Sequence, residues 1–194
     1  VCSSAETLRQ EDLKKSGIVL GDSHALSAWR TDAYLCRNDG QTLNGAINRG
    51  FDSWTKRFTL DPDCKPFFLR TNPEDQKELT LDLVRRYIAE LQSWQQRNDV
   101  ELIEVVASLP IENESRKLPK TGYFKGQPFW GTWLDRHYAH TIFDDALRSA
   151  CQANGFSFIE WPEEFINEND ELDFCFMEKP RSVHISPEHY MWEI

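Results

Sequence analysis

The sequence has no stretch that approaches the roughly 20 consecutive apolar residues of a membrane-spanning helix. Residues 1–5 lack the basic and apolar regions of a signal peptide, and the chain does not begin with Met. The missing apolar stretch predicts a protein that does not span a membrane. The acidic net charge described below disfavours binding to anionic membranes, and the cysteine usage predicts a cytoplasmic location.

Cysteine is also sparse, with five residues that are widely spaced and include no Cys-x-x-Cys pair. An odd number of scattered cysteines indicates unpaired thiols in a reducing compartment rather than a disulfide framework or a zinc site. His137 and His140 fall on one face of a predicted helix, but no His-Glu-x-x-His motif accompanies them. We therefore predict no metal and no cofactor.

Basic residues are in deficit, with 22 Lys and Arg against 32 Asp and Glu, which gives a net charge of -10. Proteins that wrap nucleic acid neutralise phosphates with Lys and Arg. Broad nucleic-acid binding is therefore not expected, although a local basic patch remains compatible with this charge.

The 194 residues include 40% hydrophobic and 28% charged residues, as in ordinary soluble domains. We find no internal repeat and no low-complexity linker, so residues 1–194 are predicted to form a single domain. An irregular insert rich in proline and glycine interrupts it at about residues 110–132.

Short apolar runs alternate with longer segments of helical periodicity. This alternation predicts an α/β protein, a three-layer α/β/α sandwich with a mostly parallel sheet. The predicted strands are residues 17–20, 67–69, 100–107 and 156–159, and the predicted helices are 25–29, 42–57, 76–97 and 135–154.

The most informative segment is Gly17-Ile-Val-Leu-Gly-Asp-Ser-His24, in which a short apolar strand runs directly into polar residues. The carboxyl end of a strand in an open α/β sheet is where sites form. Ser23 is a candidate nucleophile there if a base and oxyanion donors reach it. The alternative is that Ser23 caps the following helix.

Gly21-Asp22-Ser23 and, near the far end, His184-Ile185-Ser186 resemble the first and last blocks of the SGNH (GDSL-type) esterases and acyltransferases. His24 resembles the GDSH variant of that family. The resemblance implies that Ser23 is the nucleophile and His184 the catalytic base, and that no cofactor is required. The alternative is that His184 is an ordinary surface histidine.

The chain departs from the family pattern three residues before His184, where Arg181 stands in place of an aspartate. An arginine cannot accept the imidazole N–H, so another group must orient His184, or Ser23 and His184 work as a dyad. The candidate carboxylates are Asp173, Glu178 and Glu188.

The resemblance further implies an oxyanion hole made by the amides of Ser23 and Gly45 and by the side chain of Asn72. Asn72 matches the family's third block only at the asparagine, and it is equally compatible with a turn before Pro73. Gly45 is compatible with a role in a turn or in helix packing.

Cations and aromatic residues are interleaved in the insert, which follows the third predicted buried strand along the sequence. Such side chains can bind anions and stack on sugars or bases, and a solvated loop is the alternative. The candidate substrate-binding residues are Asp22, His24, Arg116, Lys120, Tyr123 and Trp130.

Together these features predict a serine esterase or acyltransferase that acts on a small-molecule or glycan O-acyl ester through an acyl-serine intermediate. Two alternatives stay open: a non-catalytic SGNH-like binding module, and a nucleotide or nucleic-acid modification enzyme that uses the cationic insert. The sequence identifies neither the acyl group nor the acceptor, and it does not set the oligomeric state.

Overall fold

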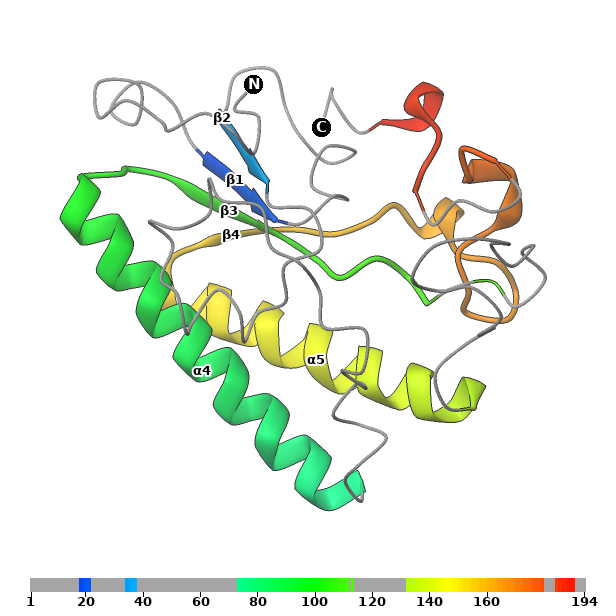
Figure 1. Ribbon diagram of the computed structural model, residues 1–194, viewed down its shortest axis with the longest axis horizontal. Helices are drawn as coiled ribbons and strands as arrows, with labels where there is room; N and C mark the ends of the chain where they lie inside the picture. The colour runs from blue at the N-terminus through cyan, green and yellow to red at the C-terminus, as the bar shows by residue number, and fades with distance from the viewer. Residues whose placement is uncertain are drawn as a thin grey trace, which may run out of the picture.

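Four short parallel strands lie side by side in the order β2-β1-β3-β4 (Figure 1). The structure is a computed structural model that describes residues 18–21, 34–37, 73–111, 113, 132–179 and 184–190. The strands are β1 (Ile18–Gly21), β2 (Tyr34–Arg37), β3 (Ile103–Val106) and β4 (Ser157–Ile159). The long helices are α4 (Pro73–Asn98) and α5 (Trp133–Asn154), and the 3-10 helices are η3 (Glu163–Phe165), η4 (Phe174–Phe176) and η5 (Pro187–His189).

The parallel sheet with alternating helices confirms the predicted α/β class. Strands β1, β3 and β4 fall within or overlap the predicted strands, whereas β2 was not predicted at all. The predicted strand 67–69 and the predicted helices 25–29 and 42–57 lie outside the described residues.

Helix α4 begins at Pro73, whose fixed φ and missing N–H suit the first turn of a helix. Its apolar residues recur every three or four positions, so they form one buried stripe. Val84, Ile88, Leu91 and Trp94 of this stripe are all at most 6% exposed. The predicted helix 76–97 is thus confirmed and extends slightly at both ends.

Both ends of helix α5 are defined by capping residues that the sequence shows. Thr132 and Asp135 form a reciprocal capping box, in which each side chain accepts a hydrogen bond from the backbone of the other. The Thr132 amide and hydroxyl, which both donate to the Asp135 carboxylate, lower the pKa of Asp135. Gly155 ends the helix with a left-handed φ of 74°, as its predicted stop role requires.

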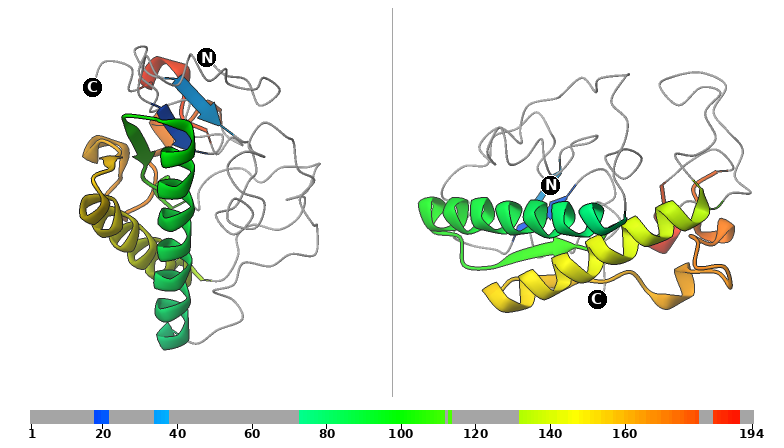
Figure 2. Two further views of the ribbon diagram at one scale, coloured as in Figure 1. Left: turned by 90° about the vertical axis from the view of Figure 1, so that its left-hand side faces the viewer. Right: turned by 90° about the horizontal axis from the view of Figure 1, so that it is seen from below.

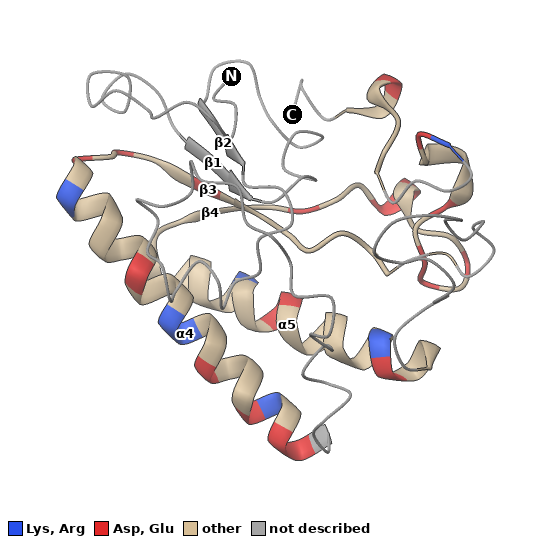
Figure 3. Ribbon diagram, viewed as in Figure 1, with Lys and Arg blue, Asp and Glu red and all other residues tan. Residues whose placement is uncertain are grey.

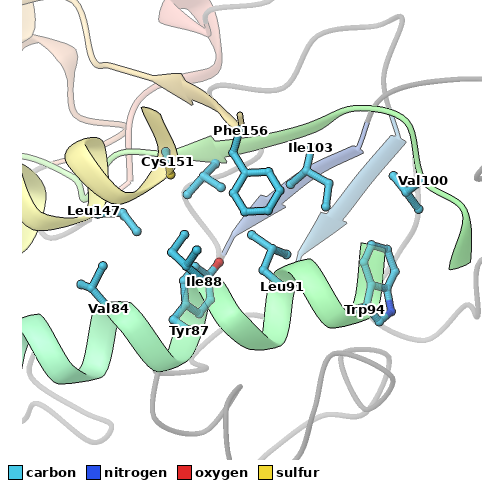
Figure 4. Packing of buried hydrophobic residues seen from close by; sticks show 11 residues of the cluster. Val84, Tyr87, Ile88, Leu91, Trp94, Val100, Ile103, Leu147, Cys151 and Phe156 are labelled. Atoms are coloured by element: carbon cyan, nitrogen blue, oxygen red, sulfur yellow. The ribbon is translucent and has the colours of Figure 1, made fainter. Parts of the chain in front are cut away.

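Both long helices pack against the same face of the sheet and against each other (Figures 1 and 2). Ile103 of β3 points into this layer (Figure 4), and Ile103 and Val105 belong to one buried cluster with Leu91 of α4 and Leu147 and Cys151 of α5. We call this set the helix–sheet cluster. Its full membership is Val84, Tyr87, Ile88, Leu91, Trp94, Val100, Ile103, Val105, Leu147, Cys151 and Phe156.

Within the described part of the chain, neither long helix has the length and apolar character needed to cross a bilayer.

Candidate functional site

The strand order creates a switch point between β1 and β3. From β1 the chain goes to β2 on one side of the sheet, and it later returns to β3 on the other side. In register, Leu20 lies beside Val105, so the carboxyl ends of β1 and β3 meet at one edge of the sheet. Open parallel sheets bind ligands in the crevice outside the carboxyl ends of strands at such a point.

Strand β1 ends at Gly21, two residues before Ser23 in the sequence. Helix α4 begins at Pro73, the residue after Asn72. Among the predicted site residues, His184 lies within the described residues. Those outside are Asp22, Ser23, His24, Gly45, Asn72, Arg116, Lys120, Tyr123 and Trp130.

A second hydrophobic cluster fills the region just beyond the carboxyl ends of β3 and β4. We call it the edge cluster: Ala107, Trp161, Phe165, Leu172, Met177 and Ile185. The amide of Ala107 donates to the carbonyl of Ile159 at 2.8 Å, and the Trp161 indole N–H donates to the carbonyl of Ala107 at 3.1 Å. The cluster therefore continues directly from the ends of the two strands.

Ile185 anchors the segment that carries His184 to this cluster. The Ile185 side chain is 1% exposed, and its backbone forms an antiparallel bridge with Met177. His184 itself is exposed to solvent. The predicted base is thus carried by a segment that is fixed at the carboxyl edge of the sheet, which is the edge where β1 ends.

Ser108, two residues after β3, was not singled out from the sequence. Its amide and its hydroxyl both donate to Oδ1 of Asp144 on α5, at 2.9 and 2.8 Å. This arrangement ties the end of β3 to α5, and it commits the Ser108 amide to a carboxylate rather than to an oxyanion. The two residues are 36 positions apart, and no local sequence pattern links them.

The three carboxylates considered as partners of His184 have different surroundings. Asp173 Oδ1 accepts from the Cys175 amide at 2.9 Å, and this hydrogen bond lowers the pKa of Asp173. Glu188 accepts from the Ser186 hydroxyl at 3.3 Å and lies 3.6 Å from Nε2 of His189. Glu178 lies beside His184, because the Glu178 amide donates to the His184 carbonyl at 2.9 Å.

The described thiols are poor nucleophiles. Burial raises the pKa of Cys151 to about 12, and its side chain is fully enclosed in the helix–sheet cluster. Cys175 is exposed, but desolvation and the adjacent Asp173 raise its pKa as well. Neither residue is expected to be a thiolate near neutral pH, so a cysteine-based mechanism finds no support at these two positions.

His137, one of the two helix-face histidines of α5, lies between an aromatic ring and a carboxylate. His137 stacks on Trp133 with ring centroids 4.6 Å apart, and its Nε2 lies 3.7 Å from Asp170 Oδ2. Across the described ranges, no group of three or more His, Cys, Asp or Glu side chains is arranged to hold a metal ion.

Most of the charged residues in the segments beyond β4 are acidic (Figure 3). In the described residues 160–179 and 184–190, Lys179 is accompanied by one buried carboxylate, Glu171, and eight carboxylates that are at least partly exposed: Glu160, Glu163, Glu164, Glu168, Asp170, Asp173, Glu178 and Glu188. Arg148 and Lys179 form ion pairs with Glu160 and Glu178, and the remaining excess of exposed carboxylates is expected to repel anionic ligands at low ionic strength.

No family model matches the sequence, and no curated protein matches it. Among solved structures, the chain is similar to a GDSL-like lipase from Bacteroides thetaiotaomicron. The two are 14% identical, with a TM-score of 0.48, and the similarity covers 91% of this chain and 82% of the lipase chain.

Proposed function

We propose that the protein is a serine esterase or acyltransferase of the SGNH type, with Ser23 as the nucleophile and His184 as the base. The observation that carries the proposal is the place of β1 at the switch point of the sheet. The motif Gly21-Asp22-Ser23 begins on the last residue of that strand.

The position of the tail supports the same function. Serine catalysis requires a base from a distant part of the chain to approach the nucleophile. Ile185, the residue after His184, is buried in the same cluster as Ala107 and Trp161, which follow β3 and β4. Strand β3 pairs with β1 on one side and with β4 on the other. The proposed nucleophile Ser23 therefore follows the strand β1 that ends at the carboxyl edge of the sheet, and the proposed base His184 belongs to the segment that is anchored at the same edge.

In the proposed reaction the Ser23 hydroxyl attacks the acyl carbonyl while the His184 imidazole accepts the hydroxyl proton. The amides of Ser23 and Gly45 and the side chain of Asn72 would donate hydrogen bonds to the oxyanion. His184 then returns the proton to the leaving alcohol, and Ser23 keeps the acyl group. Water or an acceptor alcohol releases that acyl group in the second half of the reaction.

We also propose the complete three-layer sandwich. Strand alternation puts Glu104 on the face opposite to Ile103 and Val105. Glu104 is only 4% exposed, which supports a further layer on the face that α4 and α5 do not occupy.

The acidic surface beyond β4 favours a neutral substrate. We propose an O-acyl ester of a neutral small molecule, with acylated carbohydrate as one class. A nucleotide or nucleic-acid substrate gains less support, since its phosphates would approach the exposed acidic residues of the segments beyond β4.

The test is labelling by a fluorophosphonate probe, which reacts with activated serines. Wild-type protein should be labelled, and Ser23→Ala and His184→Ala should abolish labelling. Ser149→Ala is the matched control, because Ser149 is an exposed serine of α5. The control variant should be labelled like the wild type.

A folded wild-type protein that takes no label would overturn the proposal and favour the binding-module alternative. Label that persists in Ser23→Ala but is lost in Ser108→Ala would assign the nucleophile to the end of β3 instead. Circular dichroism of each variant shows whether a loss of labelling reflects a loss of fold.

A further inference from the structure

We propose that Glu178 is the positioning residue that orients the His184 imidazole, in the role that the aspartate three residues before the histidine would fill. The inference rests on the proposed function of His184. Its physical basis is the backbone pairing between the segment that contains Met177 and Glu178 and the segment that contains His184 and Ile185.

The two segments run antiparallel at Met177 and Ile185. The Glu178 amide donates to the His184 carbonyl at 2.9 Å, and the Ser186 amide donates to the Phe176 carbonyl at 2.7 Å. These two hydrogen bonds flank the Met177–Ile185 pair on both sides. The register therefore sets Glu178 directly opposite His184.

Burial shows on which side of the two paired segments each cross-strand pair of side chains lies. Met177 and Ile185 are 8% and 1% exposed and both belong to the edge cluster. Their neighbours Glu178 and His184 are both exposed. Because successive side chains of an extended segment alternate between faces, Glu178 and His184 lie together on the outer face. Directly opposed Cβ atoms are about 5 Å apart, which is within reach of a glutamate and an imidazole.

The other two carboxylates have competing roles. Asp173 caps η4 through the Cys175 amide, and Glu188 is close to Ser186 and His189. Glu178 has a nearby cation, since Lys179 Nζ lies 3.8 Å from its carboxylate. An exposed ion pair of this kind is worth little, so it would not hold Glu178 away from His184.

The chemistry asked of Glu178 is limited and specific. A carboxylate that accepts the Nδ1–H of His184 fixes the tautomer in which Nε2 carries the lone pair that accepts the Ser23 proton. The same carboxylate stabilises the imidazolium that forms when that proton arrives. Glu178 contacts neither the substrate nor the reacting atoms in this arrangement.

The kinetic test compares Glu178→Ala, Glu178→Gln and Glu178→Asp on a neutral acyl ester. We expect Glu178→Ala to lower kcat by about 100-fold with KM little changed. This is less than the ~10⁴-fold loss in a buried triad, because solvent reaches this pair. Glu178→Asp should recover part of the rate. Glu188→Gln, a matched exposed glutamate two residues beyond Ser186, should retain wild-type kcat.

A second measurement does not depend on activity. Nitrogen-15 NMR of the His184 ring at pH 8 reports which ring nitrogen carries the proton. We expect one dominant tautomer, protonated at Nδ1, in the wild type and a mixture in Glu178→Ala. Ile103→Val, which perturbs only the helix–sheet cluster, should leave the tautomer unchanged.

The outcomes separate the two proposals. A wild type that is inactive and takes no fluorophosphonate label contradicts the esterase proposal, while the NMR result still decides whether Glu178 orients His184. An unchanged tautomer in Glu178→Ala overturns the role of Glu178. The role of Glu178 is also overturned if the wild type is active and Glu178→Ala has the same kcat as Glu188→Gln.

Discussion

The helix–sheet cluster and the edge cluster are built in different ways. The first joins two long helices to β3, and its members are mostly aliphatic side chains at most 6% exposed. The second joins 3-10 helices and isolated bridges, and aromatic rings stack around it, such as Phe165 on Phe176 at 4.6 Å. One cluster is held by regular secondary structure, and the other by packing between irregular segments.

The difference separates stability from function. A core between helices and strands unfolds with the whole domain, whereas short segments docked at an edge can open alone. The proposed catalytic histidine is carried by the second kind of structure. The edge cluster is therefore expected to control the site more strongly than it controls the free energy of unfolding.

The largest expected effect on stability comes from the helix–sheet cluster. Leu91 is fully buried, so Leu91→Ala should lower the free energy of unfolding by about 2–5 kcal/mol. Leu79→Ala on the same helix is the control, since Leu79 is 48% exposed. Urea denaturation measures both variants, and equal losses would contradict the described packing of α4.

A smaller and more local effect is expected at the edge. Ile185→Val should cost about 1 kcal/mol by removing one methylene. Hydrogen exchange should accelerate at the amides of Glu178 and Ser186, which flank Ile185 in the antiparallel pair. Ile103→Val is the matched control, because Ile103 is also 1% exposed.

If Ile103→Val accelerated exchange at the Glu178 and Ser186 amides as much as Ile185→Val did, the two clusters would form one cooperative unit. The proposed separation of scaffold and site would then be wrong. Proton exchange at the Leu91 amide serves as the internal reference, and it should be unchanged in Ile185→Val.

An effect of similar size, outside both clusters, is expected at the start of α5. Thr132→Ala should lower the free energy of unfolding by about 1 kcal/mol by removing the cap hydroxyl. Its partner Asp135 has a lowered pKa, so the contribution of that carboxylate is complete above its unfolded pKa of about 3.9. It is lost as the pH falls through the lower folded pKa.

The destabilisation by Asp135→Asn, measured by urea denaturation, should therefore be present at pH 7 and shrink below pH 4. An effect that grew as the pH fell would contradict the capping box. Glu101→Gln is a suitable control for the loss of one exposed acidic charge.

The sequence predicted the scaffold well where a pattern repeats. Leu79, Leu83, Tyr87, Leu91 and Trp94 recur at helical spacing, and Gly155 stops α5 at the predicted position. The stripe is buried only from its second half on, since Leu79 is 48% exposed whereas Tyr87, Leu91 and Trp94 are buried. β2 was missed because Tyr34-Leu-Cys-Arg37 is only four residues long and is flanked by polar residues. Its pairing with β1 is a tertiary contact that no local pattern reports.

The edge of the sheet was far less predictable. The tail histidine was identified by its motif, but its anchor, the Met177–Ile185 bridge, depends on two isolated residues. The link between Ser108 and Asp144 likewise joins a loop and a helix with no shared periodicity. Such contacts depend on the completed fold, so the sequence suggested three carboxylates for His184 without ordering them.

The central place of β1 also has a consequence for the order of folding. Ile18 pairs with Tyr34 on one side, but its partner on the other side is Ile103, which follows the whole of α4. Closing so long a loop costs entropy before any contact repays it, so this pairing is expected to be a late and slow step. During synthesis, the side of β1 that pairs with β3 therefore has no partner strand until β3 has left the ribosome.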